Sequence, residues 1–217
     1  MDVAYVINDE LQKNILYANF VSGTDREKYF KTYIKKYFTS FSHSIDSKEA
    51  ETGNWSRYRD NTSSSDRDAE IYRKMQKNII ENKKPILYGL LKESDYEMGF
   101  ESKAEKYFNE LYRKYETTAD TILQNIYLEN LDKNTHVLKE IIFIIAELPK
   151  NRRKNLAYIA IAGLSNESDE VKDLSIRCFE AWNEKKYLSI LKNHVFRSRR
   201  LEEYKKEVIR SLETDGE

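Results

Sequence analysis

Two clusters of basic side chains near the C-terminus are the strongest candidates for binding chemistry in this sequence. The first comprises Lys150, Arg152, Arg153 and Lys154, and the second comprises Lys192, Arg197, Arg199 and Arg200. Ammonium and guanidinium groups bind phosphate and carboxylate oxygens, so these residues could meet phosphates or an acidic partner protein. Cations also stabilise the C-terminal ends of helices, so a solvated helix edge is the alternative interpretation.

A second candidate site is the segment Trp55-Ser56-Arg57-Tyr58-Arg59, which lies in a polar stretch from residue 42 to residue 65. Exposed Trp, Tyr and Arg together are typical of interface hot spots and of surfaces that stack on bases. A disordered linker is the alternative, although linkers contain few aromatic residues. Trp55, Arg57, Tyr58 and Arg59 are therefore retained as partner-binding candidates.

Residues with the spacing of a metal site or a catalytic motif are missing from the sequence. His43, His136 and His194 lie far apart, and none has a second ligand four residues away. Cys178 falls on the apolar face of a predicted helix, which is typical of a small buried hydrophobic residue. The six glycines form no phosphate-binding loop and no nucleophile elbow. We therefore predict no enzyme activity, no metal and no cofactor.

The composition limits the class of protein further. The chain has 217 residues, 40% of them hydrophobic, which is enough for one domain or two small ones. Lys and Arg number 37, as do Asp and Glu, and the zero net charge argues against binding nucleic acid by bulk electrostatics alone. One cysteine and an N-terminus without a signal-type apolar run favour a cytoplasmic location. The longest apolar run, 141–148, is far shorter than the roughly 20 residues of a membrane helix, so no membrane contact is expected. The oligomeric state is left open.

The helices that would position these residues follow from the glycine, proline and apolar patterns. Six glycines and two prolines favour an all-α fold. A helix is expected over about 1–21, and Thr24 with Glu27 forms a capping box that opens a second one. One face of that helix carries Phe30, Tyr33, Ile34, Tyr37, Phe38 and Phe41. The polar loop 42–65 then separates an N-terminal part, 1–65, from a helical domain, 66–217, unless the chain forms one continuous domain.

Three more helices are expected between residues 66 and 130. The first runs from Asp66 to about Asn82, and Pro85 opens a short one after it. The inward-facing residues predicted for the first are Ala69, Tyr72, Met75, Ile79 and Ile80, and those for the second are Leu87, Leu90 and Leu91. Ser102 and Glu105 form another capping box, and the stripe that follows stays in phase far enough for one long or gently kinked helix to reach Asn130.

The C-terminal third is the most apolar part of the sequence. We expect a buried helix over Val137–Leu148, ended by Pro149, and a second apolar helix over Leu156–Leu164. After an acidic turn at 166–170, the next helix has one face made of Val171, Leu174, Ser175, Cys178, Phe179 and Trp182. Two further helices would use Tyr187, Leu188, Leu191 and Val195, and then Leu201, Tyr204, Val208 and Leu212.

These helices pair into two hairpins offset by about 34 residues. The pairs are 135–148 with 152–164 and 169–182 with 185–195. The segment Leu164–Trp182 resembles the repeat boundary of HEAT-like proteins, in which an acidic turn precedes apolar–basic pairs such as Val171-Lys172 and Ile176-Arg177. The resemblance covers roughly 135–212 and implies a HEAT-like α-solenoid of antiparallel helical hairpins. Phe179 and Trp182 are larger than that pattern normally allows, so an irregular helical bundle is the alternative.

The resemblance implies a function in binding. We expect a non-enzymatic protein-binding module, of the adaptor, regulatory or immunity type, that acts through a helical-repeat surface. If the hairpins stack in parallel, the turns at 150–154 and 192–200 would share one edge and join into a basic ridge. A nucleic-acid-binding protein using that ridge is the alternative. Alkylpurine DNA glycosylases are HEAT-like enzymes with Trp and Asp on a concave face, but Trp182 lies on the predicted buried face and Trp55 in a loop, so their site does not carry over.

Overall fold

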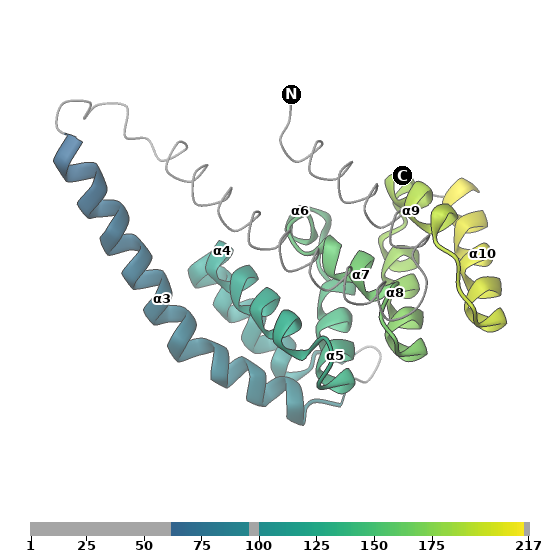
Figure 1. Cartoon of the computed structure of the whole chain (residues 1–217), viewed down its shortest axis with the longest axis horizontal. Coiled ribbons are helices and arrows are strands. Elements are labelled where there is room, and N and C mark those ends of the chain that lie inside the picture. The colour runs from purple at the N-terminus through teal and green to yellow at the C-terminus, as the bar shows by residue number, and fades with distance from the viewer. Residues whose placement is uncertain (1–61, 96–99, 215–217) are drawn as a thin grey trace. The chain divides into compact units, whose positions relative to one another are not determined.

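A computed structural model describes residues 62–95 and 100–214 of the chain (Figure 1). These residues contain helices and no strand, which confirms the predicted all-α class for the described part. The helices are α3 (Thr62–Glu93), α4 (Lys103–Asn130), α5 (Thr135–Ala146), α6 (Lys150–Arg153), α7 (Ala157–Gly163), α8 (Asp169–Trp182), the 3₁₀ turn η1 (Lys185–Tyr187), α9 (Leu188–Asn193) and α10 (Arg199–Thr214).

The chain divides into two compact units within α4, after Ile126. One unit contains α3 and most of α4, and the other contains the described residues from Tyr127 onward. The helices predicted before residue 62, the Thr24–Glu27 capping box and the predicted boundary at residue 65 depend on residues outside the described ranges.

α3 is longer than the sequence pattern predicts. Thr62–Ser65, expected in the polar loop, are helical, and the predicted break at Pro85 is wrong because α3 continues to Glu93. Pro85 is exposed, so the helix tolerates it: the carbonyl of Glu81, four residues earlier, loses its N–H partner on the solvent side, where water can replace it.

The inward direction predicted for Tyr72 and Met75 is also wrong. Their exposed fractions are 49% and 59%, while Ile79 and Ile80 are half-buried. Among the described residues of this unit, the buried apolar side chains come instead from the C-terminal half of α3 and from α4: Leu87, Leu91, Ala104, Phe108, Leu111, Ala119, Ile122, Leu123 and Ile126. The spacing of apolar residues therefore identified which residues of α3 share a face, but not whether another element packs against that face.

α4 begins and continues as the sequence predicts. The hydroxyl of Ser102 accepts a hydrogen bond from the N–H of Glu105 at 3.0 Å, which confirms the capping contact. The helix reaches Asn130 with one kink at Tyr115, where φ is −142° and ψ is 29°. The expected long, kinked helix is therefore confirmed.

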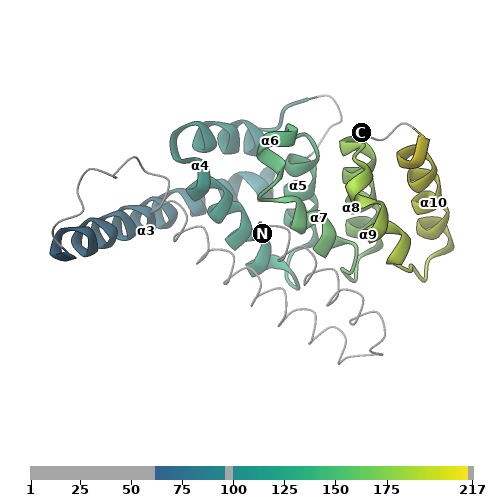
Figure 2. The ribbon, with the colours of Figure 1, turned by 90° about the horizontal axis from the view of Figure 1, so that it is seen from above.

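In the second unit α5, α8 and α10 lie side by side and run in the same direction (Figures 1 and 2). Between α5 and α8, Lys139 pairs with Glu170 near the start of both helices, and the indole N–H of Trp182 reaches the last turn of α5. Between α8 and α10, Arg200 pairs with Asp173, and Tyr204 donates to Glu180 further along both helices. Contacts that advance together along two helices establish that the helices are parallel.

Two shorter helices line the same layer. α7 packs against α5 and α8, and α9 packs against α10. All seven residues of α7 are buried, and four of them are Ala or Gly. The small side chains allow close approach: a Cβ atom added to Gly163 would collide with the hydroxyl oxygen of Ser175 on α8.

The ends of α5 and α8 are set by individual residues that can be recognised in the sequence. The Asn134 side chain accepts a hydrogen bond from the N–H of Val137 at 3.3 Å, and the Ser168 hydroxyl accepts one from the N–H of Val171 at 3.5 Å. α8 ends at Asn183, which adopts the left-handed conformation with φ of 47°. The expected helices around 137–148, 156–164 and 169–182 are confirmed within a few residues.

The short α9 region departs from the prediction at two residues. Val195, expected inward, is 70% exposed, and the next residue, Phe196, is buried in its place. His194 is buried as well. The α9 helix ends at Asn193, and His194 has extended backbone, so the helical spacing that predicted an inward Val195 no longer applies there.

Candidate binding surface on α5, α8 and α10

The first predicted basic cluster is divided between the surface and the interior. Lys150 and Lys154 are exposed, and Arg152 is half-buried. Arg153 turns inward: its side chain is 12% exposed, its Nε lies 3.4 Å from Oε1 of Glu184, and its guanidinium lies 5.6 Å from the centre of the Trp182 ring. Arg153 therefore ties the turn before α7 to the turn after α8.

The second predicted basic cluster is largely paired with carboxylates. Lys192 lies 2.5 Å from Glu213, and Arg199 lies 2.7 Å from Glu203. Arg200 lies 2.5 Å from Asp173. Arg197 is exposed. Cations held by carboxylates are less available to phosphates than the sequence cluster suggests.

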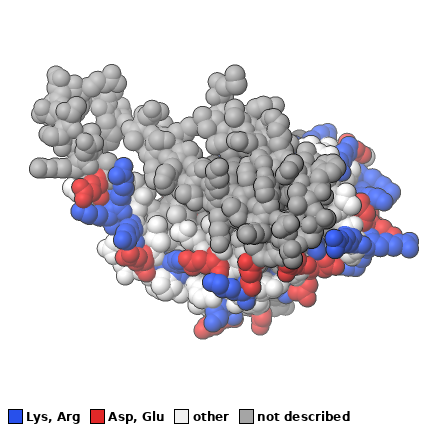
Figure 3. Space-filling model, viewed as in Figure 1, with Lys and Arg blue, Asp and Glu red and all other residues white. Residues whose placement is uncertain are grey.

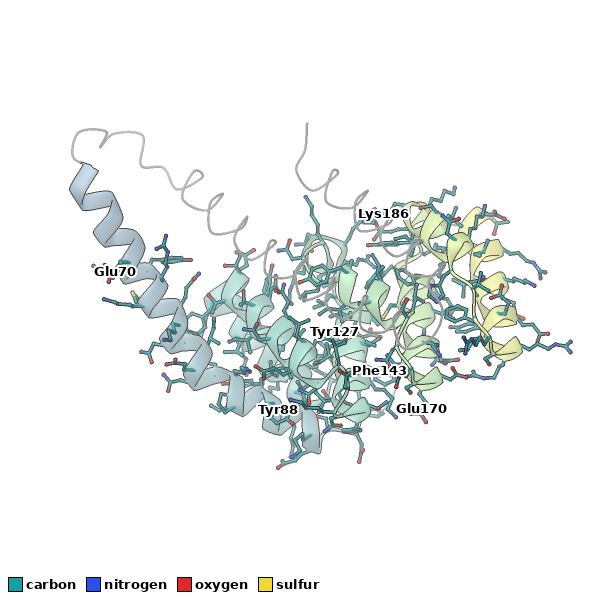
Figure 4. All side chains as sticks on the ribbon, viewed as in Figure 1. Glu70, Tyr88, Tyr127, Phe143, Glu170 and Lys186 are labelled. Atoms are coloured by element: carbon teal, nitrogen blue, oxygen red, sulfur yellow. The ribbon has the colours of Figure 1, made fainter. Side chains whose placement is uncertain are left out.

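The predicted ridge does not contain all the residues of both clusters, because Arg200 lies far from Arg153. Arg153 pairs with Glu184 just beyond the last residue of α8, and Arg200 pairs with Asp173 in its first turns. The 14 residues of α8 span about 21 Å, and Figure 4 places Glu170 and Lys186 at opposite ends of this helix. Arg153 and Arg200 therefore lie at opposite ends of α8, whereas Lys192 pairs with Glu213 near the C-terminal end of the parallel helix α10.

A shallow hollow of about 250 Å³ lies over α5, α8 and α10. Its lining residues are Lys139, Phe143, Glu170, Asp173, Leu174 and Arg200. Phe143, labelled in Figure 4, is half-buried, and Leu174 is 9% exposed; these two side chains supply its apolar part.

The charged groups around the hollow are paired with one another across the helices. Lys139 of α5 lies 2.7 Å from Glu170 of α8, and Asp173 of α8 lies 2.5 Å from Arg200 of α10. The hydrogen bond and charge of Lys139 hold the pKa of the Glu170 carboxyl below its usual value. The rim of the hollow thus carries both signs of charge and no net charge. On the described part of the face shown in Figure 3, basic and acidic residues are likewise interspersed.

An aromatic cluster beneath this layer was not predicted as a structural unit. The ring centres of Phe179 and Trp182 are 5.4 Å apart, and those of Trp182 and Tyr187 are 5.2 Å apart. The Trp182 indole N–H donates to the carbonyls of Ile145 at 3.3 Å and Ala146 at 3.2 Å, which are the last carbonyls of α5. The large residues that depart from the HEAT pattern therefore connect α8 to α5.

Cys178 lies next to this cluster. Its thiol donates to the carbonyl of Ile142 at 3.5 Å, and burial raises the pKa of the thiol. This confirms the prediction that Cys178 occupies a buried position on the apolar face of its helix.

A second buried polar cluster joins α9 to α10. The Lys205 side chain is 5% exposed; its ammonium donates to the carbonyl of His194 at 2.6 Å and pairs with Glu202 at 2.6 Å. Glu202 also accepts the N–H of Phe196 at 3.1 Å. Burial acts to raise the pKa of Glu202, but the hydrogen bonds from Lys205 and Phe196 outweigh it and hold this pKa below its usual value. A lysine in a strongly charged helix gave no sequence signal for this burial.

Trp55, Arg57, Tyr58 and Arg59 lie outside the described residues. Within residues 62–95 and 100–214, no three His, Cys, Asp or Glu side chains form a group that could hold a metal ion. No helix in these ranges combines the length and apolarity needed to cross a membrane.

The chain matches no protein-family model, no curated protein and no solved structure.

Proposed function

We propose that this chain is a non-enzymatic helical protein-binding module, and that the hollow over α5, α8 and α10 receives a segment of a partner protein. The observation that carries the proposal is an apolar floor, Phe143 and Leu174, surrounded by two ion pairs. Protein interfaces have this anatomy: an apolar centre that loses water on binding and a polar rim.

The charges define the class of partner. Because each cation on the rim already has a carboxylate partner, a strongly acidic or strongly basic ligand would have to displace an ion pair. An amphipathic segment with one or two apolar anchors and charges of both signs can cover the floor without doing so. The partner we propose is such a segment.

The parallel layer of α5, α8 and α10 supports a binding role of the helical-repeat type. Stacked helices create an extended surface whose residues come from several elements, as the hollow does with three. A HEAT-like array over 135–212 is part of the same proposal. Its resemblance to HEAT repeat boundaries and the close approach at Gly163 support it.

The test uses the full chain as bait in a lysate of its native host, followed by affinity measurement with the purified partner. Phe143→Asp should weaken binding at least roughly tenfold because it places a charge on the apolar floor. Arg200→Glu, at an exposed rim position, should weaken binding less. Ser211→Asp is the control, since it adds the same charge at an exposed site toward the other end of α10.

Two results would overturn the proposal. One is a partner whose affinity is equal for wild type, Phe143→Asp and Ser211→Asp, with circular dichroism showing all three folded. The other is binding of a short oligonucleotide that weakens steeply with salt, with a salt slope reduced by Lys150→Ala/Lys154→Ala. Lys150 and Lys154 are better probes than Arg153, whose removal would strip Glu184 of an ion-pair partner.

A further inference from the structure

Two turns of the second unit bring positive charge to the C-terminal end of α8. The first, 149–155, contains the short helix α6 and leads from α5 to α7, and the second, 183–187, follows α8. Nε of Arg153 in the first turn lies 3.4 Å from Oε1 of Glu184 in the second, so the two turns are in contact. Four cations of these turns are called here the basic edge: Arg153, Lys154, Lys185 and Lys186.

The basic edge carries more positive charge than its own carboxylate balances. Glu184 is the one acid in the two turns, and its side chain is 4% exposed. It is shared by Arg153 and by Lys186, whose ammonium lies 2.6 Å from Oε2. Lys154 and Lys185 are exposed and form no ion pair with another described residue. The edge therefore keeps a surplus of cations. Lys150 and Arg152 of the first turn make other contacts, so the basic edge does not include them.

Arg153 is the most firmly placed of these cations. Its Nε is the nitrogen nearest to Glu184, and its guanidinium lies 5.6 Å from the centre of the Trp182 ring. The Nη groups lie further from that carboxylate, and the side chain is partly exposed. A planar guanidinium that is already fixed in position loses little conformational entropy when it binds a second carboxylate through its forked donors.

The stability of the helices does not account for all of this charge. Cations near the C-terminal ends of helices are stabilising, and both α5 and α8 end at these turns. However, α6 has four residues, of which three are cations and none is an acid, and Lys154 follows directly. A helix of a single turn has too small a dipole to require them. The surplus charge therefore indicates contact with an anion from outside the chain.

The surroundings of the basic edge favour carboxylates over nucleic acid. Proteins that hold single strands combine cations with exposed aromatic rings on which bases stack. The rings beside this edge, Trp182 and Tyr187, are 4% and 5% exposed, so neither can stack on a base. Double-stranded DNA is held through about six to ten phosphate contacts, more than this edge supplies. The chain as a whole also has no net charge to attract a polyanion.

We propose that the basic edge binds an acidic segment of a partner protein, with about three carboxylates that match its surplus of cations. The edge lies at the C-terminal end of α8, whereas Glu170 and Asp173 border the hollow near the N-terminal end of that helix (Figure 4). This inference goes beyond the segment proposed for the hollow and does not depend on it. Complementary charge of this kind speeds the encounter and selects against partners of the same sign.

The first experiment measures binding of the full chain to a fluorescein-labelled acidic peptide by fluorescence anisotropy. The peptide has about 12 residues, of which about six are Asp or Glu, with Gly and Ser between them to keep it flexible. We expect a dissociation constant of roughly 10–100 µM at about 50 mM salt, which weakens at least roughly threefold at about 200 mM salt. The same peptide with Asn and Gln in place of Asp and Glu should not bind.

The second experiment assigns the binding to the basic edge. Lys154→Glu/Lys185→Glu should raise the dissociation constant of the acidic peptide at least roughly tenfold. Lys133→Glu/Lys206→Glu is the matched control, since it makes the same change in net charge just before α5 and in the middle of α10. The control should change the constant less than roughly threefold. Circular dichroism should show both variants folded, because all four lysines are exposed.

The third experiment replaces the peptide by an oligothymidylate of about seven nucleotides, whose phosphates are about as many as the carboxylates of the peptide. We expect it to bind more weakly than the acidic peptide, because no exposed ring beside the edge can stack on its bases. An oligothymidylate that binds more tightly than the peptide, and loses this binding in Lys154→Glu/Lys185→Glu, would assign the edge to nucleic acid and overturn the proposal.

Two further results would overturn it. One is an acidic peptide that does not bind the full chain at about 50 mM salt. The other is equal weakening of peptide binding by Lys154→Glu/Lys185→Glu and by Lys133→Glu/Lys206→Glu, because the attraction would then belong to the whole chain. Failure of the acidic peptide to bind leaves the proposal for the hollow standing, since Phe143→Asp tests that surface with a different partner.

Discussion

The contact between α7 and α8 at Gly163 allows a sharp test of how closely these helices pack. A Cβ atom at Gly163 would collide with the hydroxyl oxygen of Ser175 and lie 3.3 Å from Cδ1 of Ile142 and from Cβ of Ser175. Gly163→Ala must therefore displace α7 or turn the Ser175 side chain out of its position. That side chain donates to the carbonyl of Val171 at 2.8 Å in a buried site.

The expected cost follows from three terms. Overpacking a tight core site costs about 1–3 kcal/mol. Loss of the Ser175 hydrogen bond adds about 1 kcal/mol, and the better helix propensity of Ala returns about 1 kcal/mol. The net destabilisation is about 2 kcal/mol, which for a chain of 217 residues corresponds to a Tm lower by about 4–8 °C.

The assay is urea and thermal unfolding followed by far-UV circular dichroism. Gly89→Ala is the matched control, because Gly89 lies in α3 and a Cβ atom there would meet nothing within 4 Å. It should be neutral or stabilising by up to about 1 kcal/mol. Gly163→Ala/Ser175→Ala removes the colliding oxygen and should recover about 1–2 kcal/mol relative to additive behaviour.

The reasoning would be refuted if Gly163→Ala were as stable as the wild type. It would also be refuted if Gly163→Ala and Ser175→Ala acted additively, because the cost would then arise away from their contact. Equal destabilisation by Gly163→Ala and Gly89→Ala would point to a general effect of the substitution on helices.

Two further predictions concern the polar contacts in this unit. Trp182→Phe keeps an aromatic ring but removes the N–H that bonds Ile145 and Ala146, and should destabilise by about 1–2 kcal/mol in urea unfolding. Glu202 has a pKa below its ordinary value of 4.5 in the folded chain, so its contribution is present above pH 4.5 and is lost as the pH falls through the folded-state pKa. Glu202→Gln replaces one acceptor oxygen by an amide NH2 and removes the charge that pairs with Lys205, so it should cost about 1–2 kcal/mol at pH 7. This difference should shrink below pH 4.5, and a gap that stays constant with pH would contradict this role.

Three of the helices that the sequence located correctly begin at residues whose side chains cap them. Asn134 and Ser168 cap α5 and α8 with their own side chains, and Ser102 does the same for α4. In each contact the capping side chain and the backbone N–H are three residues apart, so both can be identified from the sequence. The predicted break at Pro85 failed for a complementary reason: whether a proline ends a helix depends on whether the carbonyl it leaves unpaired can reach solvent.

The sequence predicts less reliably which side chains are buried, because burial depends on which other elements of the fold pack against a helix face. Tyr72 and Met75 have the spacing of a core stripe, and Lys205 has the composition of a solvated face. The structure exposes the first two and buries the third against the carbonyl of His194. An apolar period tells which residues share a face, and a partner element decides whether that face is inside.

The basic clusters also depend on tertiary contacts that the sequence does not reveal. Arg153, Lys192 and Arg200 find carboxylates 31, 21 and 27 residues away in the sequence, at Glu184, Glu213 and Asp173. Spacing along the chain cannot reveal such pairs. The single edge predicted for both clusters fails at Arg200, which lies beside the first turns of α8, whereas Arg153 lies beyond the last turn of that helix.

The ties between α5, α8 and α10 explain why the hollow has a defined shape. Apolar faces of parallel helices can slide past one another at small cost, because hydrophobic contacts lack direction. Lys139 with Glu170 and Trp182 with the last carbonyls of α5 set that register near both ends of the pair. The contacts of Arg200 with Asp173 and of Tyr204 with Glu180 set the register between α8 and α10. Two of these four contacts, Lys139 with Glu170 and Arg200 with Asp173, also form the rim of the hollow. The groups that would contact a partner therefore fix the relative positions of the three helices before the partner binds.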